Sequence, residues 1–168
     1  MSKPTGSLDF CRRALEQREI FWAEQAEAIH WHKPFHRVCD FSKPPFAKWF
    51  VGGETNLCYN AIDRHLPLRA NQSALHYISS EIDTARSFTY QELYDEVCRF
   101  SAVLKSLGLK PGDRVIIYLP MIPEAVFAML SCVRLGLVHS VVFAGFAPAS
   151  LATRIGDAEA RLVMTADA

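Results

Sequence analysis

The sequence predicts an α/β fold with a parallel sheet, and three observations predict it. From residue 74 onward, apolar segments of strand length alternate with helical segments. Two of these segments, RVIIYL at 114–119 and VHSVVF at 138–143, are almost continuously apolar. Strands that are buried on both faces of a parallel sheet have this composition. Glycine and proline, which end helices and form turns, separate the segments.

The first 70 residues have a different character. A helix is expected over residues 8–29, where apolar residues recur between many charges. After Trp31 the prolines at 34, 44 and 45 prevent the helix from continuing. A segment rich in Trp and Pro but without clear periodicity indicates an extended chain that aromatic side chains anchor to another surface. A short helix over 56–66 follows and ends at Pro67.

The second part begins with a strand predicted at 74–79. Thr89 and Glu92 fit a capping box, in which each side chain satisfies a free amide at the start of a helix. The helix behind the box is predicted to end at Gly108 and to be followed by a turn over 110–113. One apolar stripe marks its buried face and comprises Leu93, Val97, Phe100, Leu104 and Leu107.

The remaining elements continue the alternation. After the strand at 114–119, Pro123 suits the first position of a helix that is apolar on nearly every side. A strand at 138–143, a short helix at 150–158 and a fourth strand at 161–165 complete the pattern. Strands and helices in this order favour crossover connections within one parallel sheet.

Composition excludes several classes of protein. The chain has 168 residues, with 18 Lys and Arg against 18 Asp and Glu, so its formal net charge is zero. Electrostatic capture of nucleic acid or of anionic lipid therefore has no support. The five cysteines are scattered and form no CxxC pair, which favours a reducing compartment over a disulfide framework. The uncharged stretch 135–153 is interpreted as a strand, a turn and a helix start rather than as a membrane span.

Two loops are candidate ligand sites, because parallel sheets bind ligands at the carboxyl ends of their strands. They are residues 119–123 and 143–148, and neither carries a GxGxxG motif or a Gly-x4-Gly-Lys-Ser/Thr loop. At residues 143–146 two interpretations stay open. In one, the segment is a tight turn in which Gly145 supplies backbone freedom. In the other, its aromatic edge stacks on a ligand ring.

Other candidates are weaker from the residues alone. Three histidines and one cysteine could ligate zinc, but surface histidines in a loop account for them better. Cys132 is expected in the core, and the charged run 63–65 on a helix surface or in an interdomain salt bridge. The sequence thus predicts no self-contained active site. The zinc candidates are His30, His32, His36 and Cys39.

Several longer runs of the sequence resemble those of a known protein family. They are FWAEQA at 21–26, TNLCYNAIDRH at 55–65, FTYQEL at 88–93, GDRVIIYLPMIPEA at 112–125, HSVVFAGF at 139–146 and TAD at 165–167. Together these runs resemble the N-terminal part of the short-chain acyl-CoA synthetases, a branch of the adenylate-forming enzymes. The run from 44 to 63 and the region 79–81 look closer to the propionate-activating members than to the acetate-activating ones.

The resemblance implies a domain plan and a reaction. Residues 1–70 would be the family's N-terminal extension, which wraps the large domain. Residues 71–168 would be the incomplete start of that AMP-binding domain, containing its first βαβαβ units. The family joins a short carboxylate to CoA with ATP and Mg²⁺, through an acyl-adenylate. Its phosphate loop, acyl pocket and catalytic Lys lie downstream, so we expect these residues alone to be inactive, with no catalytic or metal-binding residue and no tight cofactor binding.

One set of cofactor-binding residues follows from the resemblance. In the family, a Phe-Gly-Gly turn lies along the CoA nucleotide with its Phe against the adenine, and it corresponds to Phe143, Ala144 and Gly145. The expected protein is a propionate–CoA ligase, with an acetate–CoA ligase as the alternative. A truncated, non-catalytic interaction module that associates through its open sheet edge is the alternative of another class. The cytoplasm is the expected compartment, and the mitochondrial matrix is the alternative.

Overall fold

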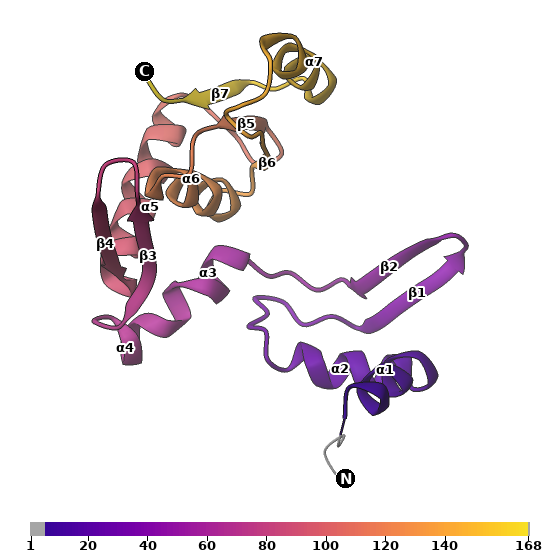
Figure 1. Ribbon diagram of the computed structural model, residues 1–168. Helices are drawn as coiled ribbons and strands as arrows, with labels where there is room; N and C mark the ends of the chain where they lie inside the picture. The colour runs from indigo at the N-terminus through magenta and orange to yellow at the C-terminus, as the bar shows by residue number, and fades with distance from the viewer. Residues whose placement is uncertain (1–5, 168) are drawn as a thin grey trace. The chain divides into compact units, whose positions relative to one another are not determined.

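The computed structural model describes residues 6–167 and contains two compact units. The first unit runs to Thr55 and the second begins at Asn56 (Figure 1). The boundary at residue 70 that the resemblance implies concerns the domains of the larger family and stays a prediction.

The first unit consists of two short helices and a hairpin. Helix α1 spans Ser7–Glu16 and α2 spans Arg18–Ala26, so the single helix predicted over 8–29 is divided. The division lies at Gln17, whose φ of −119° and ψ of 43° are not helical. The Arg13 guanidinium donates to the Glu24 carboxylate at 2.8 Å and joins the two helices across this break. Periodicity alone did not predict the break, because the apolar spacing continues through it.

The proline-rich segment of the first unit forms an antiparallel hairpin of β1, Arg37–Lys43, and β2, Phe46–Val51. Pro44 and Pro45 occupy the turn between the strands, where neither has to donate a ladder hydrogen bond. Next to the hairpin, Trp31 packs on the Phe50 ring with the centroids 5.3 Å apart. Gly53 permits this packing, since a Cβ there would lie 2.7 Å from the Trp31 ring. These aromatic side chains therefore anchor the segment within its own unit.

The second unit begins with three short helices and a hairpin packed on a long helix. They are α3 at Leu57–Ala61, η1 at Asp63–His65, α4 at Leu66–Arg69, β3 at Ser73–Ser79, β4 at Thr84–Thr89 and α5 at Tyr90–Ser106. The capping box of Thr89 and Glu92 is present, and the pKa of Glu92 is lowered by the hydrogen bond from the Thr89 amide. Buried side chains from α3 and the residue that follows it, from β4 and α5, and from helix α6 at Pro123–Arg134 form a first core: Cys58, Ile62, Phe88, Leu93, Val97 and Phe127.

The strand predicted at 74–79 exists, but it lies outside the parallel sheet. Strand β3 pairs antiparallel with β4, with His76 opposite Ser87. Strand β4 was not expected from the sequence, because its residues TARSFT are mostly polar and four of its six positions are exposed. A strand on a solvated hairpin lacks the apolar run that identifies a buried one.

The parallel sheet contains the other three predicted strands in the order β6-β5-β7. Strand β5 spans Arg114–Tyr118, β6 spans Val138–Val141 and β7 spans Leu162–Thr165. Helix α6, Pro123–Arg134, connects β5 to β6, and α7, Pro148–Ala158, connects β6 to β7. Helices α5 and α6 lie on one side of the sheet and α7 on the other (Figure 1). Val115 and Ile117 of β5 pack with side chains of α5 and α6 in a second core.

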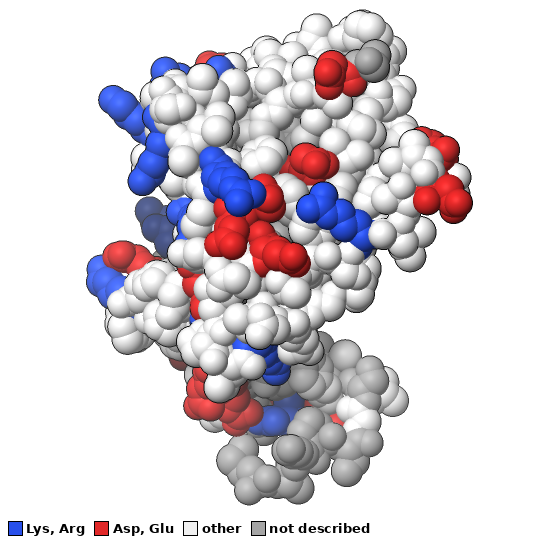
Figure 2. Space-filling view, turned by 90° about the vertical axis from the view of Figure 1, so that its left-hand side faces the viewer, with Lys and Arg blue, Asp and Glu red and all other residues white. Residues whose placement is uncertain are grey.

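The surface is mixed in charge. On the face shown in Figure 2, Lys and Arg side chains are interspersed with Asp and Glu. Several ion pairs join neighbouring residues, among them Arg99 with Glu96 at 2.6 Å. Within residues 6–167, none of the helices has the length and apolar character needed to cross a bilayer.

Candidate functional site

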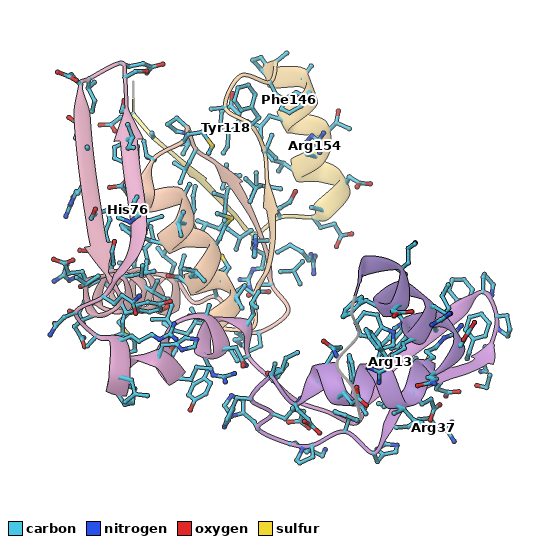
Figure 3. The ribbon with its side chains drawn as sticks, turned by 60° about the horizontal axis from the view of Figure 1, so that its bottom comes forward. Arg13, Arg37, His76, Tyr118, Phe146 and Arg154 are labelled. Atoms are coloured by element: carbon cyan, nitrogen blue, oxygen red, sulfur yellow. The ribbon has the colours of Figure 1, made fainter. Side chains whose placement is uncertain are left out.

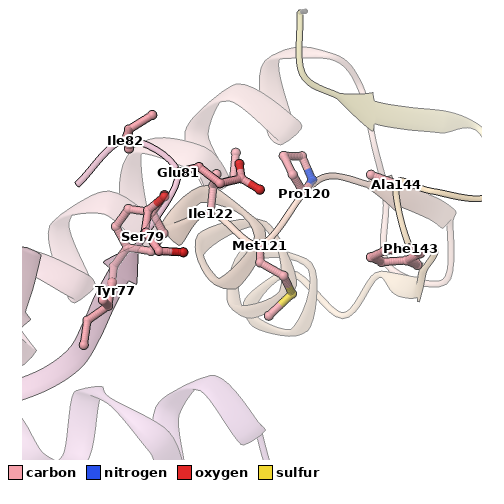
Figure 4. Close-up of a pocket in the computed structure, with 11 residues that line it drawn as sticks. Tyr77, Ser79, Glu81, Ile82, Pro120, Met121, Ile122, Phe143 and Ala144 are labelled. Carbon is pink, nitrogen blue, oxygen red and sulfur yellow. The ribbon is translucent and has the colours of Figure 1, made fainter. Parts of the chain in front are cut away.

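A groove of about 570 Å³ lies at the carboxyl ends of β5 and β6. One wall is the tip of the β3–β4 hairpin, and the other consists of the segments that follow β5 and β6 (Figure 4). Ligands in parallel α/β folds bind at the end of the sheet where the strands have their carboxyl ends, and the groove lies at that end. Its lining comprises Tyr77, Ile78, Ser79, Ser80, Glu81, Ile82, Pro120, Met121, Ile122, Phe143 and Ala144.

Strands β5 and β6 determine the position of the second wall, which consists of the segments that follow them. Ile116 and Ile117 are fully buried and hold β5 at the centre of the sheet. The last backbone bond between β5 and the chain after β6 runs from the Val142 amide to the Ile117 carbonyl at 2.9 Å. Val142 is buried, whereas the next residue, Phe143, is 65% exposed. The chain therefore leaves the core at Phe143, and its ring lies at the groove.

Residues 143–146 form a tight turn. The Phe146 amide donates to the Phe143 carbonyl at 3.1 Å, and the two rings meet edge to face with centroids 6.3 Å apart. The hydroxyl of Tyr118, the last residue of β5, reaches two carbonyls of the turn. Its distance is 2.6 Å to the Ala144 oxygen and 3.1 Å to the Phe146 oxygen. Figure 3 shows Tyr118 directed toward the segment that carries Phe146.

Gly145 contributes to the turn by lacking a Cβ, and not by adopting backbone angles that other residues avoid. It is not among the glycines with positive φ, which are Gly52, Gly108, Gly112 and Gly136. A Cβ on Gly145 would instead lie 2.5 Å from Cε1 of the Phe143 ring. The glycine is thus explained by the close approach of the Phe143 ring. Of the two interpretations left open by the sequence, the tight turn is present, and it carries an exposed aromatic edge as well.

The charges around the groove are few. Glu81 is the one ionisable carboxylate in its lining, and the lining contains neither Lys nor Arg. On the far side of the turn, the Arg154 guanidinium of α7 lies over the Phe146 ring, 5.2 Å from its centroid. Sequence reasoning missed Tyr118, Arg154 and the hairpin tip, because each belongs to a different element from the turn and only folding brings them together.

The contacts and burial of Asp63, Cys58 and Cys132 indicate structural roles for these weaker candidates. Asp63 accepts two hydrogen bonds from Arg134 of α6, at 2.6 and 2.9 Å, so a salt bridge is present at Asp63, and both of its partners lie within the second unit. Burial raises the pKa of the Cys58 thiol and raises that of Cys132 to about 11. Neither thiol is therefore activated as a nucleophile.

The histidines of the first unit do not gather into a ligand set. The His30 and His32 rings meet edge to face, with centroids 5.1 Å apart. Among residues 6–167, the structure places no group of three or more His, Cys, Asp or Glu side chains where they could hold a metal ion.

Comparisons with known proteins give a consistent result along the chain. Residues 63–168 match the family "AMP-binding enzyme", and residues 8–61 match "Acetyl-coenzyme A synthetase N-terminus". A propionate–CoA ligase of Salmonella typhimurium is 51% identical over 95% of this chain and 26% of its own length. An acetyl-coenzyme A synthetase of Mycolicibacterium smegmatis is 53% identical over 92% of this chain and 16% of its own length.

A solved structure extends the likeness to the fold. The acetoacetyl-CoA synthetase from Streptomyces lividans aligns with a TM-score of 0.88 and 30% identity, over 96% of this chain and 25% of that chain. The chain thus spans about a quarter of the length of the propionate–CoA ligases that it matches.

Proposed function

The chain belongs to the AMP-binding enzymes, and from this membership we propose that it is the N-terminal part of a propionate–CoA ligase. The observation that carries the proposal is 51% identity to such a ligase over 95% of the chain. The likeness runs through both compact units, since one family match covers residues 8–61 and the other covers 63–168. We place the protein in the cytoplasm, with the mitochondrial matrix as the alternative.

The proposed reaction has two steps. A propionate oxygen attacks the α-phosphorus of ATP, the bond to the β-phosphate breaks, and pyrophosphate leaves. The CoA thiol then attacks the carbonyl carbon of propionyl-adenylate and loses its proton, and AMP departs with the electron pair of the broken C–O bond. Adenylation is needed because a carboxylate oxygen is a poor leaving group, whereas AMP is a good one.

The described residues contribute to the second step in this proposal. Phe143, Ala144 and Gly145 form the turn along which the CoA nucleotide lies, with the exposed Phe143 ring against the adenine. A 65% exposed aromatic ring beside a groove can stack on a base, and such stacking stabilises a bound base by about 1–3 kcal/mol. Family members often have Gly where this chain has Ala144, so the backbone approaches the ligand across one added methyl group.

The residues described here do not fit a site for Mg²⁺ and the ATP phosphates. They provide no cluster of metal ligands, and the groove lining has no Lys or Arg to face a triphosphate. We therefore assign no adenylation step to them. Adenylation, in this proposal, is the work of parts of the ligase that these residues do not include.

Acetate is the alternative substrate. Acetyl-coenzyme A synthetases match at 50–53% identity, a range that includes the 50–51% identity to the propionate–CoA ligases. The proposal favours propionate because residues 79–81 have the propionate-like sequence, and these residues lie at the hairpin tip that lines the groove.

Propionate-dependent exchange of pyrophosphate into ATP tests the proposal. We expect no exchange from residues 1–168 alone. A chimera in which this chain replaces the matching 26% of the Salmonella typhimurium ligase should retain exchange and form propionyl-CoA. A folded chimera without activity would contradict the proposal, and so would full activity of the chain alone. The same assays on the protein as encoded in full, with acetate and propionate in parallel, decide between the two substrates.

Phe143→Ala in the active protein tests the CoA contact. The KM for CoA should rise about 10-fold or more with pyrophosphate exchange intact, because a stacking partner of the base is lost. Phe46→Ala is the matched control, since this ring is 78% exposed on β2 of the other unit. An unchanged KM in Phe143→Ala would remove the contact from the proposal.

A non-catalytic interaction module is the second proposal, and the open edges of the parallel sheet favour it. Strands β6 and β7 each pair only with β5 among the described strands, and Val141 of β6 is 52% exposed. Such edges are templates for pairing with another chain. Sedimentation of the chain over a range of concentrations should show self-association that Val141→Lys weakens. A monomer at every concentration would rule this module out.

A further inference from the structure

Tyr118 joins the centre of the sheet to the turn that follows β6. Its backbone belongs to β5 and pairs with Thr165 of β7, so the sheet fixes the position of the Tyr118 backbone. Its hydroxyl lies 2.6 Å from the Ala144 carbonyl oxygen and 3.1 Å from that of Phe146. A hydroxyl carries a single hydrogen, so it donates chiefly to the nearer oxygen and interacts more weakly with the other.

The turn has few other restraints. Ladder pairing of β6 ends at Val141, and the Val142 amide makes the last bond to β5. Beyond it, the backbone hydrogen bond within the turn runs from the Phe146 amide to the Phe143 carbonyl. Among the described residues, Tyr118 supplies the side-chain hydrogen bonds that the turn accepts. Without them, the Ala144 carbonyl would have no hydrogen-bond donor among the described residues.

The position of the Phe143 ring depends on these residues. The ring lies so close to Gly145 that a Cβ there would force the ring to move, and it meets the Phe146 ring edge to face. Tyr118 fixes the carbonyls on both sides of Gly145, namely those of Ala144 and Phe146. It therefore fixes the surface against which the Phe143 ring rests.

We propose that Tyr118 is a positioning residue for the coenzyme: its hydroxyl holds the 143–146 turn so that the Phe143 ring is presented to the CoA adenine. The inference rests on the proposed function, since it requires the ring to contact CoA. Tyr118 itself touches no reacting atom in this account. Its effect on CoA passes through Phe143, and this dependence makes the inference testable.

Tyr118→Phe is the variant to measure, in the protein as encoded in full or in the active chimera. It keeps the ring and removes one hydroxyl. We expect the KM for CoA to rise about 3- to 10-fold, the range for losing one hydrogen bond, while the KM for ATP and the pyrophosphate exchange rate stay unchanged. Tyr90→Phe is the matched control, because the Tyr90 ring belongs to α5 and packs 5.7 Å from His65. It should alter none of these constants.

A double-mutant cycle separates positioning from general destabilisation. If Tyr118 acts through Phe143, adding Tyr118→Phe to Phe143→Ala should change the KM for CoA no further. Additive effects would overturn the inference, and so would an unchanged KM in Tyr118→Phe alone. An effect of Phe143→Ala without one of Tyr118→Phe refutes the inference and leaves the proposed function intact. No effect of Phe143→Ala refutes the CoA contact itself. Thermal melting of each variant identifies the temperature at which all are folded for the comparison.

Discussion

At the scale of single residues, the turn after β6 shows how one side chain can require glycine at another position. Gly145 has no positive φ, so its backbone angles would accept other residues. The Phe143 ring occupies the space that a Cβ would need, 2.5 Å from its Cε1 atom. The ring is 65% exposed and lies at the end of its side chain, so it can move away from a new methyl group at little cost in stability. The substitution would instead change the direction in which the Phe143 ring points.

Gly145→Ala should therefore affect binding more than folding. We expect the free energy of unfolding to change by less than about 0.5 kcal/mol, as for other surface sites, while the KM for CoA rises several-fold. Gly156→Ala is the matched control, because a Cβ on Gly156 of α7 meets nothing within 4 Å. It should leave the KM unchanged and stabilise the helix by up to about 1 kcal/mol. Equal KM values in the two variants would contradict this account of Gly145.

At the scale of elements, residues 56–65 are attached to α6 by polar side chains. The Asn56 side-chain amide donates to the Val133 carbonyl at 3.0 Å, at the end of α6. Arg134 donates twice to Asp63 and once to the Cys58 sulfur, and both charged side chains are less than a quarter exposed. The TNLCYNAIDRH run thus has a structural explanation, in which its polar residues bind the last turn of α6.

Asp63→Asn should destabilise the chain by about 2 kcal/mol, between the values for exposed and fully buried pairs, because Arg134 would lose its countercharge while partly desolvated. Urea denaturation of residues 1–168 measures the change. Glu96→Gln is the control, since its partner Arg99 is 71% exposed, and it should cost less than about 0.5 kcal/mol. A cost for Asp63→Asn no larger than that of the control would show that the Asp63–Arg134 pair contributes little.

At the scale of the whole molecule, stability should depend on pH through His139. Burial lowers the pKa of this β6 side chain below its ordinary value of 6.5. The unfolded chain therefore binds a proton more readily than the folded one as the pH falls through this region. The stabilisation is complete above about pH 6.5 and is lost as the pH drops through the lowered pKa of the folded chain.

Urea denaturation at pH 7.5 and pH 5.5 measures this effect. The free energy of unfolding should be larger at pH 7.5, and His139→Gln should reduce the difference. His76→Gln serves as the control, because His76 lies on the exposed face of the β3–β4 hairpin and bonds to Ser87 at 2.8 Å. A pH dependence that persists in full in His139→Gln would contradict the assignment to His139.

Local chemistry determined much of the second unit from sequence alone. The capping box at Thr89 and Glu92 fixed the start of α5, and the apolar runs identified β5, β6 and β7. The long ordered runs of matching sequence identified the family. These features could be predicted because each depends on residues that are near one another in the chain.

Tertiary structure alone decided how distant residues combine. It paired β3 with the polar strand β4, divided the first helix at Gln17, and brought Tyr118 to the carbonyls of Ala144 and Phe146. It also showed that Gly145 is required by the Phe143 ring and not by its own backbone. The physical reason is that strand partners and side-chain contacts across the sheet are set by packing between segments, which local propensity and periodicity do not encode.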